Sequence, residues 1–122
     1  MIDSIRLTNT EKDLLVRIKR KTGIDSWNIL CRWALVIGLT AKDARNRINP
    51  EKRDAIEIRW DTFVGKNKHI YNALTLLAYE NNGDKGIDFS DFIHNRIEYG
   101  IRSIQKQIND KSILVFSDFS ES

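Results

Sequence analysis

The chain has 122 residues, of which 41% are hydrophobic and 30% charged, the composition of a soluble globular domain that can bury its own core. Its single cysteine, Cys31, excludes a disulfide within the chain and a thiolate zinc site. We see neither a signal peptide nor a stretch long enough to span a bilayer, so we expect a cytoplasmic domain with no membrane contact.

The charges are distributed unevenly along the chain. Residues 1–47 carry ten Lys or Arg against five Asp or Glu, a net charge of +5, whereas residues 48–122 carry ten against twelve, a net charge of −2. A basic N-terminal third on a nearly neutral body favours a surface that faces a polyanion. A solvated helix face explains a run of cations equally well, so charge alone leaves both interpretations open.

Residues 2–7 have the alternating pattern of a short strand. Ile5 and Leu7 fall on one face of this strand, and Arg6 falls on the other. No second strand is predicted within the first 40 residues. Pairing with the same strand of another chain is therefore one way to satisfy its backbone hydrogen bonds.

A helix follows the strand directly. Thr8 and Glu11 have the spacing of a capping box, which predicts that the helix begins near residue 9. Gly23 supplies its C-terminal stop. One face of the helix is an apolar stripe formed by Leu14, Leu15 and Ile18.

Five cations lie on the two flanks of this stripe, Lys12 and Lys19 on one side and Arg17, Arg20 and Lys21 on the other. Cations in a last turn also suit the helix dipole, which is a purely structural reason for their presence. Cations that contact phosphates release counterions and position a nucleic-acid backbone without reading its bases. The predicted DNA-binding residues are Arg6, Lys12, Arg17, Lys19, Arg20 and Lys21.

The next helix, predicted over residues 26–40 and capped by Asp25 or Ser26, is apolar around nearly its whole circumference. The preceding strand and helix cannot cover such a helix. The rest of the chain, a second subunit or both must pack on it. We expect it to supply an oligomer interface formed by Trp27, Leu30, Trp33 and Ile37.

The second half of the chain starts with a polar segment. Residues 41–54 hold the only proline and read as a linker with room for one helical turn. Residues 55–60 alternate again and predict a second strand, with Trp60 on its apolar face. The tail beyond residue 108 is apolar and then acidic, and its pattern fits an added strand or a disordered end.

Two further helices are predicted in this half. The first covers about residues 67–81, with an apolar stripe formed by Ile70, Leu74, Leu77 and Ala78. The second is capped by Asp88 and runs to about residue 108, with a stripe formed by Phe89, Ile93, Ile97, Ile101 and Ile104. The expected fold is mainly α and oligomeric, in one domain over residues 1–122: strand-helix-helix in 1–40, a helical part in 55–108 and a tail in 109–122.

Catalytic patterns are poorly represented. Cys31 lies in the most apolar helix, where burial raises the pKa of a thiol and leaves it inert. His69 and His94 belong to no pair with metal-ligand spacing, and a lone helical histidine is more often a surface or interface residue than a ligand. We expect no catalytic residue, no metal and no cofactor.

The succession of strand, helix, glycine turn and helix is the outline of ribbon-helix-helix DNA-binding proteins. In these proteins two chains pair their N-terminal strands into a ribbon that enters the major groove. Here the strand would present Ser4 and Arg6 to the bases, a small set for sequence recognition.

Three segments resemble the DndE family of DNA sulfur modification proteins over about residues 2–105. They are "IDSIRLTNTEKDLLVRIKRKTGIDSWNILCRWAL", "EIRWDTFVGKNKHIYNALTLL" and "FIHNRIEYGIRSI". The most specific part combines Trp27, Cys31, Arg32 and Trp33, a set that is unusual in one short helix.

The resemblance implies a place in the machinery that replaces a non-bridging phosphate oxygen of DNA with sulfur, a mark used in bacterial restriction-modification. It implies a ribbon-helix-helix variant that assembles as a homotetramer and binds nicked double-stranded DNA through surface lysines. It also implies work beside a cysteine desulfurase, an iron–sulfur sulfurtransferase and an ATPase-like subunit. The family's basic residues at the end of the first helix correspond here to Arg17, Lys19, Arg20 and Lys21.

We therefore expect a non-catalytic DNA-binding component of a DNA phosphorothioation complex, which contacts the DNA backbone through a basic patch on a homo-oligomer. Two alternatives remain open at this stage. One is a sequence-specific ribbon-helix-helix transcriptional regulator. The other is a protein-interaction scaffold within the sulfur-modification complex.

Overall fold

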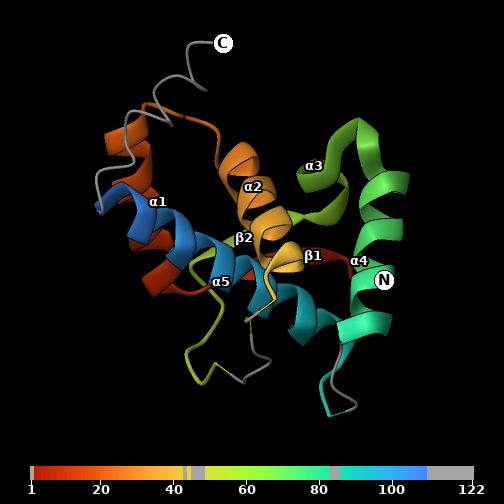
Figure 1. The fold of residues 1–122 in the computed structure, drawn as a ribbon. Helices are drawn as coiled ribbons and strands as arrows, with labels where there is room; N and C mark the ends of the chain where they lie inside the picture. The colour runs from red at the N-terminus through yellow and green to blue at the C-terminus, as the bar shows by residue number, and fades with distance from the viewer. Residues whose placement is uncertain (1, 43, 45–48, 83–85, 110–122) are drawn as a thin grey trace.

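A computed structural model describes residues 2–42, 44, 49–82 and 86–109 of the chain (Figure 1). In chain order the elements are β1 (Ser4–Leu7), α1 (Asn9–Thr22), α2 (Trp27–Thr40), β2 (Ile56–Arg59), α3 (Trp60–Val64), the 3-10 helix η1 (Gly65–Asn67), α4 (Lys68–Asn82) and α5 (Phe89–Asn109). The predicted strands and the four predicted helices are confirmed, and α3 with η1 was not predicted.

The centre of the fold is the crossing of α2 and α5, the two helices with the most extensive mutual contact. A methyl group on Gly38 would overlap the backbone carbonyl of Arg96, and one on Gly100 would overlap the carbonyl of Ala34. Glycine at these two positions lets the backbones of the helices approach each other directly. The crossing therefore buries much of α2 without a second subunit.

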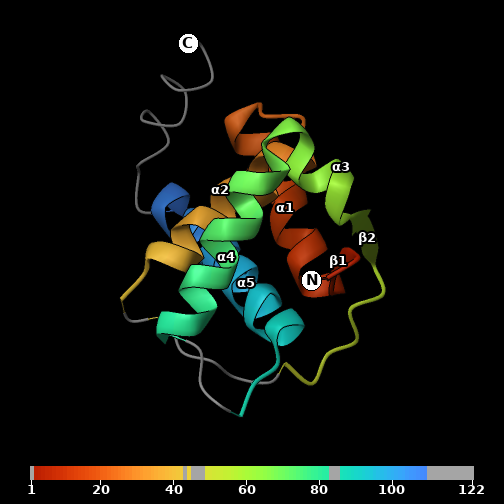
Figure 2. The ribbon, with the colours of Figure 1, turned by 90° about the vertical axis from the view of Figure 1, so that its right-hand side faces the viewer.

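The remaining core is built around this crossing. The stripe predicted for α5 is confirmed, because Ile93, Ile97, Ile101 and Ile104 are completely buried and Phe89 is half-buried. From α1, Leu15 and Ile18 are completely buried against the same core. Figures 1 and 2 show α1 and α4 on opposite sides of the α2–α5 pair.

The caps of the first two helices form as predicted. The Thr8 side chain accepts from the backbone N–H of Glu11, and the Glu11 carboxylate accepts from the backbone N–H of Thr8, so the capping box is complete. Gly23 ends α1 with a φ of 74°, in the left-handed region. Ser26 caps α2 by accepting from the backbone N–H of Ile29 at 3.3 Å.

The strand β1 finds its partner within the chain. It pairs antiparallel with β2, so that Ser4 lies opposite Arg59 and Leu7 opposite Ile56. A strand from a second chain is not needed to satisfy β1 on this edge. The strand-helix-helix order of a ribbon-helix-helix protein is present, while the two-stranded sheet here joins segments about fifty residues apart.

The segment after β2 differs from the prediction. We placed Trp60 on the strand and expected an irregular lead into the next helix, but Trp60 starts α3 and stacks on Phe63 with ring centroids 5.4 Å apart. Both rings are buried. Burying two large aromatic side chains within four residues favours one helical turn over a straight strand.

Three of the four residues of the stripe predicted for α4 face outward, while Ala78 is half-buried against the core. Ile70, Leu74 and Leu77 are 59%, 47% and 55% exposed, and the side of α4 that packs inward carries Tyr71, Thr75 and Tyr79 instead. The Tyr79 hydroxyl donates to the carbonyl of Ile87 at 2.7 Å. The helical periodicity of the sequence correctly identified an apolar face of α4. Polar and aromatic contacts nevertheless determine which side of α4 packs on the core.

In the linker, described residues 41, 42, 44 and 49–54 contain no helical turn. The rest of the linker and the tail beyond residue 109 lie outside the described residues.

Replacing Gly100 with alanine should destabilise the protein by about 1–3 kcal/mol, because the added methyl group forces α5 away from the carbonyl of Ala34. Urea unfolding followed by circular dichroism measures this change. Gly86→Ala is the matched control, since its added Cβ would meet nothing within 4 Å. Equal stability of the two variants would contradict the tight crossing.

Candidate nucleic-acid interface

The five predicted cations of α1 lie on its solvent side, which also carries Asp13, and are here called the α1 basic surface: Lys12, Arg17, Lys19, Arg20 and Lys21. Four of them are exposed and Lys19 is half-buried. The buried residues Leu15 and Ile18 lie on the opposite side of the helix. The helix period thus keeps the cations in solvent while the apolar stripe fixes α1 on the core.

Two contacts fix the edges of this surface. The Lys19 ammonium lies over the ring of Trp27, 5.3 Å from its centroid, which places that flank beside the start of α2. The Lys21 ammonium donates to the Oδ1 of Asn109 at 3.3 Å, which places the other flank beside the end of α5. The surface therefore spans the C-terminal end of α1 and reaches both neighbouring helices.

None of the five cations forms an ion pair with an acidic side chain in the part of the chain that the structure describes. The positive charge of α1 is consequently not neutralised by the surrounding fold. Cations held in solvent without a protein carboxylate are the groups that contact phosphates most readily.

The helix α5 adds cations that the sequence did not suggest. Arg102 and Lys106 are exposed and lie one turn apart on α5, just before Asn109, the residue that binds Lys21. Arg102 also lines a hollow of about 310 Å³ together with Thr10 from the first turn of α1. Arg102 and Lys106 lie on the side of the molecule that carries α1 because α1 packs on α5. No local sequence pattern predicts this packing.

Arg6 lies on β1, at the opposite end of α1 from Lys19, Arg20 and Lys21. It precedes α1, whose 14 residues span about 21 Å, so it lies far from the cations of the last turn. Its guanidinium Nε donates to the Glu57 carboxylate at 2.7 Å on the paired strand. The sequence placed Arg6 among the phosphate contacts; the structure shows its exposed ion pair with Glu57, and its contact with DNA stays a prediction.

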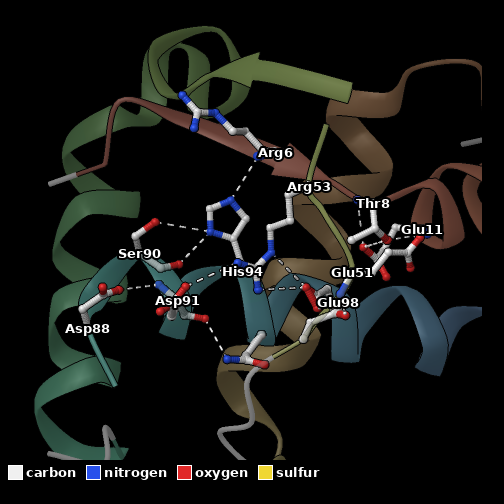
Figure 3. A network of polar contacts seen from close by, with 12 residues as sticks. Arg6, Thr8, Glu11, Glu51, Arg53, Asp88, Ser90, Asp91, His94 and Glu98 are labelled. Carbon is white, nitrogen blue, oxygen red and sulfur yellow. Dashed lines mark hydrogen bonds and ion pairs between the residues drawn. The ribbon is translucent and has the colours of Figure 1, made fainter. Parts of the chain in front are cut away.

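A network of polar contacts holds the segment before β2 on α5 (Figure 3). The Arg53 guanidinium donates to the Glu98 carboxylate at 3.2 Å and to the Asp91 carboxylate at 3.3 Å. Glu51 accepts from the Thr10 hydroxyl at 2.7 Å. These bonds tie residues 51–53 to both α1 and α5 and so set the position from which β2 starts.

His94 connects the same network to β1. Its Nε2 accepts from the backbone N–H of Arg6 at 3.0 Å, and its Nδ1 lies 2.7 Å from the carbonyl of Ser90, to which it donates (Figure 3). This arrangement needs the neutral ring with its proton on Nδ1. We expected a surface or interface position for a lone helical histidine, but His94 is buried and serves the fold.

Burial lowers the pKa of His94 below its ordinary value near 6.5, and the nearby charge of Arg53 lowers it further. The carbonyl of Ser90 and the carboxylates of Glu98 and Asp91 act in the opposite direction without overcoming burial. The ring therefore stays neutral under conditions in which an exposed histidine would begin to take up a proton.

Cys31 is inert, and the described residues hold no metal-binding cluster. Cys31 is completely buried, and burial raises the pKa of its thiol to about 12, as we expected from its apolar helix. Within residues 2–42, 44, 49–82 and 86–109, no three His, Cys, Asp or Glu side chains could hold a metal ion. No described helix is both long and apolar enough to cross a bilayer.

The four residues predicted for the oligomer interface differ in accessibility. Leu30 is completely buried within the protomer and belongs to its core. Trp27, Trp33 and Ile37 are half-buried and keep part of their surface in solvent. Their role between subunits stays a prediction.

The comparisons with known proteins agree on one family. The family model for DNA sulphur modification protein DndE matches residues 4–112 of this chain. The fold is similar to the crystal structure of DndE from Escherichia coli B7A involved in DNA phosphorothioation modification, with a TM-score of 0.67 and 19% identity over 85% of this chain and 97% of that chain. A search of curated proteins found no match.

A crystal structure of a DndE mutant involved in DNA phosphorothioation is similar as well. Its TM-score is 0.63 at 17% identity, over 87% of this chain and 99% of that chain. At such identities the structural likeness establishes the fold, a mainly helical one with a small two-stranded sheet.

The free energy of unfolding should fall as the pH drops below about 6.5. In that range the unfolded chain binds a proton at residue 94, while the folded chain, with its lowered His94 pKa, does not. His94→Gln should remove this part of the pH dependence, as measured by urea unfolding between pH 7.5 and the onset of acid unfolding. Parallel curves for the two proteins would contradict a buried neutral ring.

Proposed function

The chain belongs to the DndE family, and from this membership we propose that it is the non-catalytic DNA-binding component of a DNA phosphorothioation complex. The observation that supports DNA binding is the α1 basic surface, whose five cations pair with no acidic side chain among the described residues. These side chains contact phosphates rather than bases, which suits a protein that meets DNA of varied sequence.

We further propose a preference for nicked duplex. A nicked duplex bends at the nick at a lower free-energy cost than an intact duplex. A rigid cationic surface that bends the DNA should therefore bind the nicked duplex more tightly. The α1 basic surface is rigid in this sense because the buried Leu15 and Ile18 hold its helix on the core.

A homo-oligomer, such as a tetramer, would multiply these weak contacts. The surface best suited to a second copy is the outward face of α4, with Ile70, Leu74 and Leu77. It is continuous with the C-terminal half of α2 across a groove of about 270 Å³, which is lined by Val36, Leu39, Thr40, Leu74, Ala78 and Asn81. Exposed apolar surface of this kind is typical of a subunit interface, and linked subunits raise avidity for one long polyanion.

The sulfur chemistry is assigned to other proteins. Cys31 is the single thiol of the chain, and its burial and raised pKa keep it from acting as a nucleophile. A cysteine desulfurase, an iron–sulfur sulfurtransferase and an ATPase-like subunit are the partners that we propose, in the cytoplasm, within a restriction-modification system.

The two alternatives make different demands on the surface. A sequence-specific regulator would read bases with β1, on which Arg6 is the one cation, a small set for sequence recognition. A scaffold would not need the α1 cations at all. The experiments below separate both alternatives from the proposal.

Replacing Lys19, Arg20 and Lys21 together with alanine should weaken binding to duplex DNA of any sequence, since each removed contact lowers the salt-dependence slope by about 0.9. Fluorescence anisotropy at several salt concentrations measures affinity and slope. The matched control is Lys42→Ala with Lys52→Ala, two exposed cations outside α1. A scaffold predicts unchanged DNA modification in cells that carry the triple variant.

The same titrations, run with nicked and intact duplexes of one sequence, test the proposed preference. Tighter binding to the nicked duplex is expected at both low and high salt, because the gain comes from shape rather than from charge. Equal affinities would remove the preference for nicks and leave backbone binding in place. Tight binding to a single palindromic site would instead favour the regulator.

Replacing Leu74 and Leu77 with glutamate should dissociate the oligomer, because two charges would then lie in the buried interface. Light scattering gives the mass of each protein in solution. Leu76→Glu is the matched control, since Leu76 is also exposed but lies about 100° from Leu77 around α4. A folded wild-type monomer in dilute buffer would contradict the assembly.

A further inference from the structure

We propose that the cations around η1 form a second contact site for the DNA backbone, so that the DNA-facing surface continues across the start of α2. This site, here called the η1 cluster, consists of Arg32 and Lys66, with Lys68 next to them at the border with β1 and β2, where it lines a hollow with Asp3 and Glu57. The inference rests on the proposed function and extends it to residues for which the sequence suggested no role.

The η1 cluster lies at the same end of the molecule as the last turn of α1. Figures 1 and 2 both show the C-terminal end of α1, the N-terminal end of α2 and the α3–η1 segment together at the top of the view. The start of α2 lies between the other two. A surface that runs from α1 to η1 must therefore cross the first turns of α2.

Arg32 joins α2 to η1. It lies in the second turn of α2, and its Nη1 is 3.6 Å from the point that a Cβ on Gly65 would occupy. Gly65 has a φ of 61°, a conformation that favours glycine and lets the chain turn from α3 into η1 directly beside the guanidinium. Lys66, the next residue, is exposed.

The cluster keeps most of its positive charge. Arg32 and Lys66 form no ion pair with any described acidic residue, and Lys68 pairs with Asp61 at 2.7 Å. The hydrogen bond from Lys68 holds the pKa of the Asp61 carboxyl below its usual range. Both side chains of this pair are exposed, and exposed pairs add little stability, so Lys68 can exchange Asp61 for a phosphate.

The two cationic sites lie close enough for one duplex to touch both. Lys19 contacts Trp27 at the start of α2, and Arg32 is five residues further along, about 7.5 Å in axial rise. The sites flank the same two turns of one helix, whose diameter is about 10–12 Å. Since duplex DNA carries one charge per about 1.7 Å of its axis, a segment that contacts α1 also presents phosphates to η1.

The test compares Lys66→Ala and the double variant Arg32→Gln with Lys66→Ala against the wild-type protein. The probe is a short intact DNA duplex at several salt concentrations. We expect the salt-dependence slope to fall by about 0.9 for each lost contact, with a loss of affinity that does not depend on sequence. Lys66→Arg should retain binding, and Lys52→Ala is the control for loss of one exposed cation elsewhere.

Each outcome decides between the two proposals. If the α1 triple variant loses affinity while the η1 variants behave like Lys52→Ala, the η1 cluster does not touch DNA. This inference is then overturned, while the proposed function stands. The cations of the η1 cluster would in that case serve to bind an acidic protein. If the wild-type protein shows no salt-dependent binding to duplex, the proposed function fails as well. Lys66→Ala, at an exposed position, gives the answer even if the double variant does not fold.

Discussion

The fold depends on the direct approach of two helix backbones. Gly38 meets the carbonyl of Arg96, and Gly100 meets the carbonyl of Ala34, so the backbones of α2 and α5 touch at these two points. This close crossing helps a domain of modest size bury one side of a helix that is apolar nearly all round, from Leu30 to Gly38. It also leaves the outer elements, α1 on one side and α4 on the other, free to present different surfaces to solvent.

Local chemistry predicted the elements whose ends carry explicit signals. The capping box of Thr8 and Glu11, the left-handed Gly23 and the cap at Ser26 fixed α1 and the start of α2 within one or two residues. The isoleucine stripe of α5 was also predictable, because a long helix with one strongly apolar face turns that face towards the core. In α4 the same reasoning identified an apolar face but not that most of it would face solvent.

The candidate site was predictable only where it lies on one helix. The spacing of the α1 cations placed them on the flanks of the stripe, but nothing local showed that Arg6 would meet Glu57, fifty-one residues later. Nor could it show that Arg32 would lie against Gly65, or that α5 would bring Arg102 towards α1. These contacts depend on tertiary packing between distant segments, on which hydrophobic periodicity carries no information.

The position of Lys19 over Trp27 has a practical consequence. The indole is half-buried at the border between α1 and α2, and one of the cations of the surface rests on its ring. Any ligand that draws this ammonium away changes the electronic surroundings of the chromophore. Trp27 fluorescence is therefore expected to report a ligand on the α1 basic surface, against the background of Trp33 and Trp60.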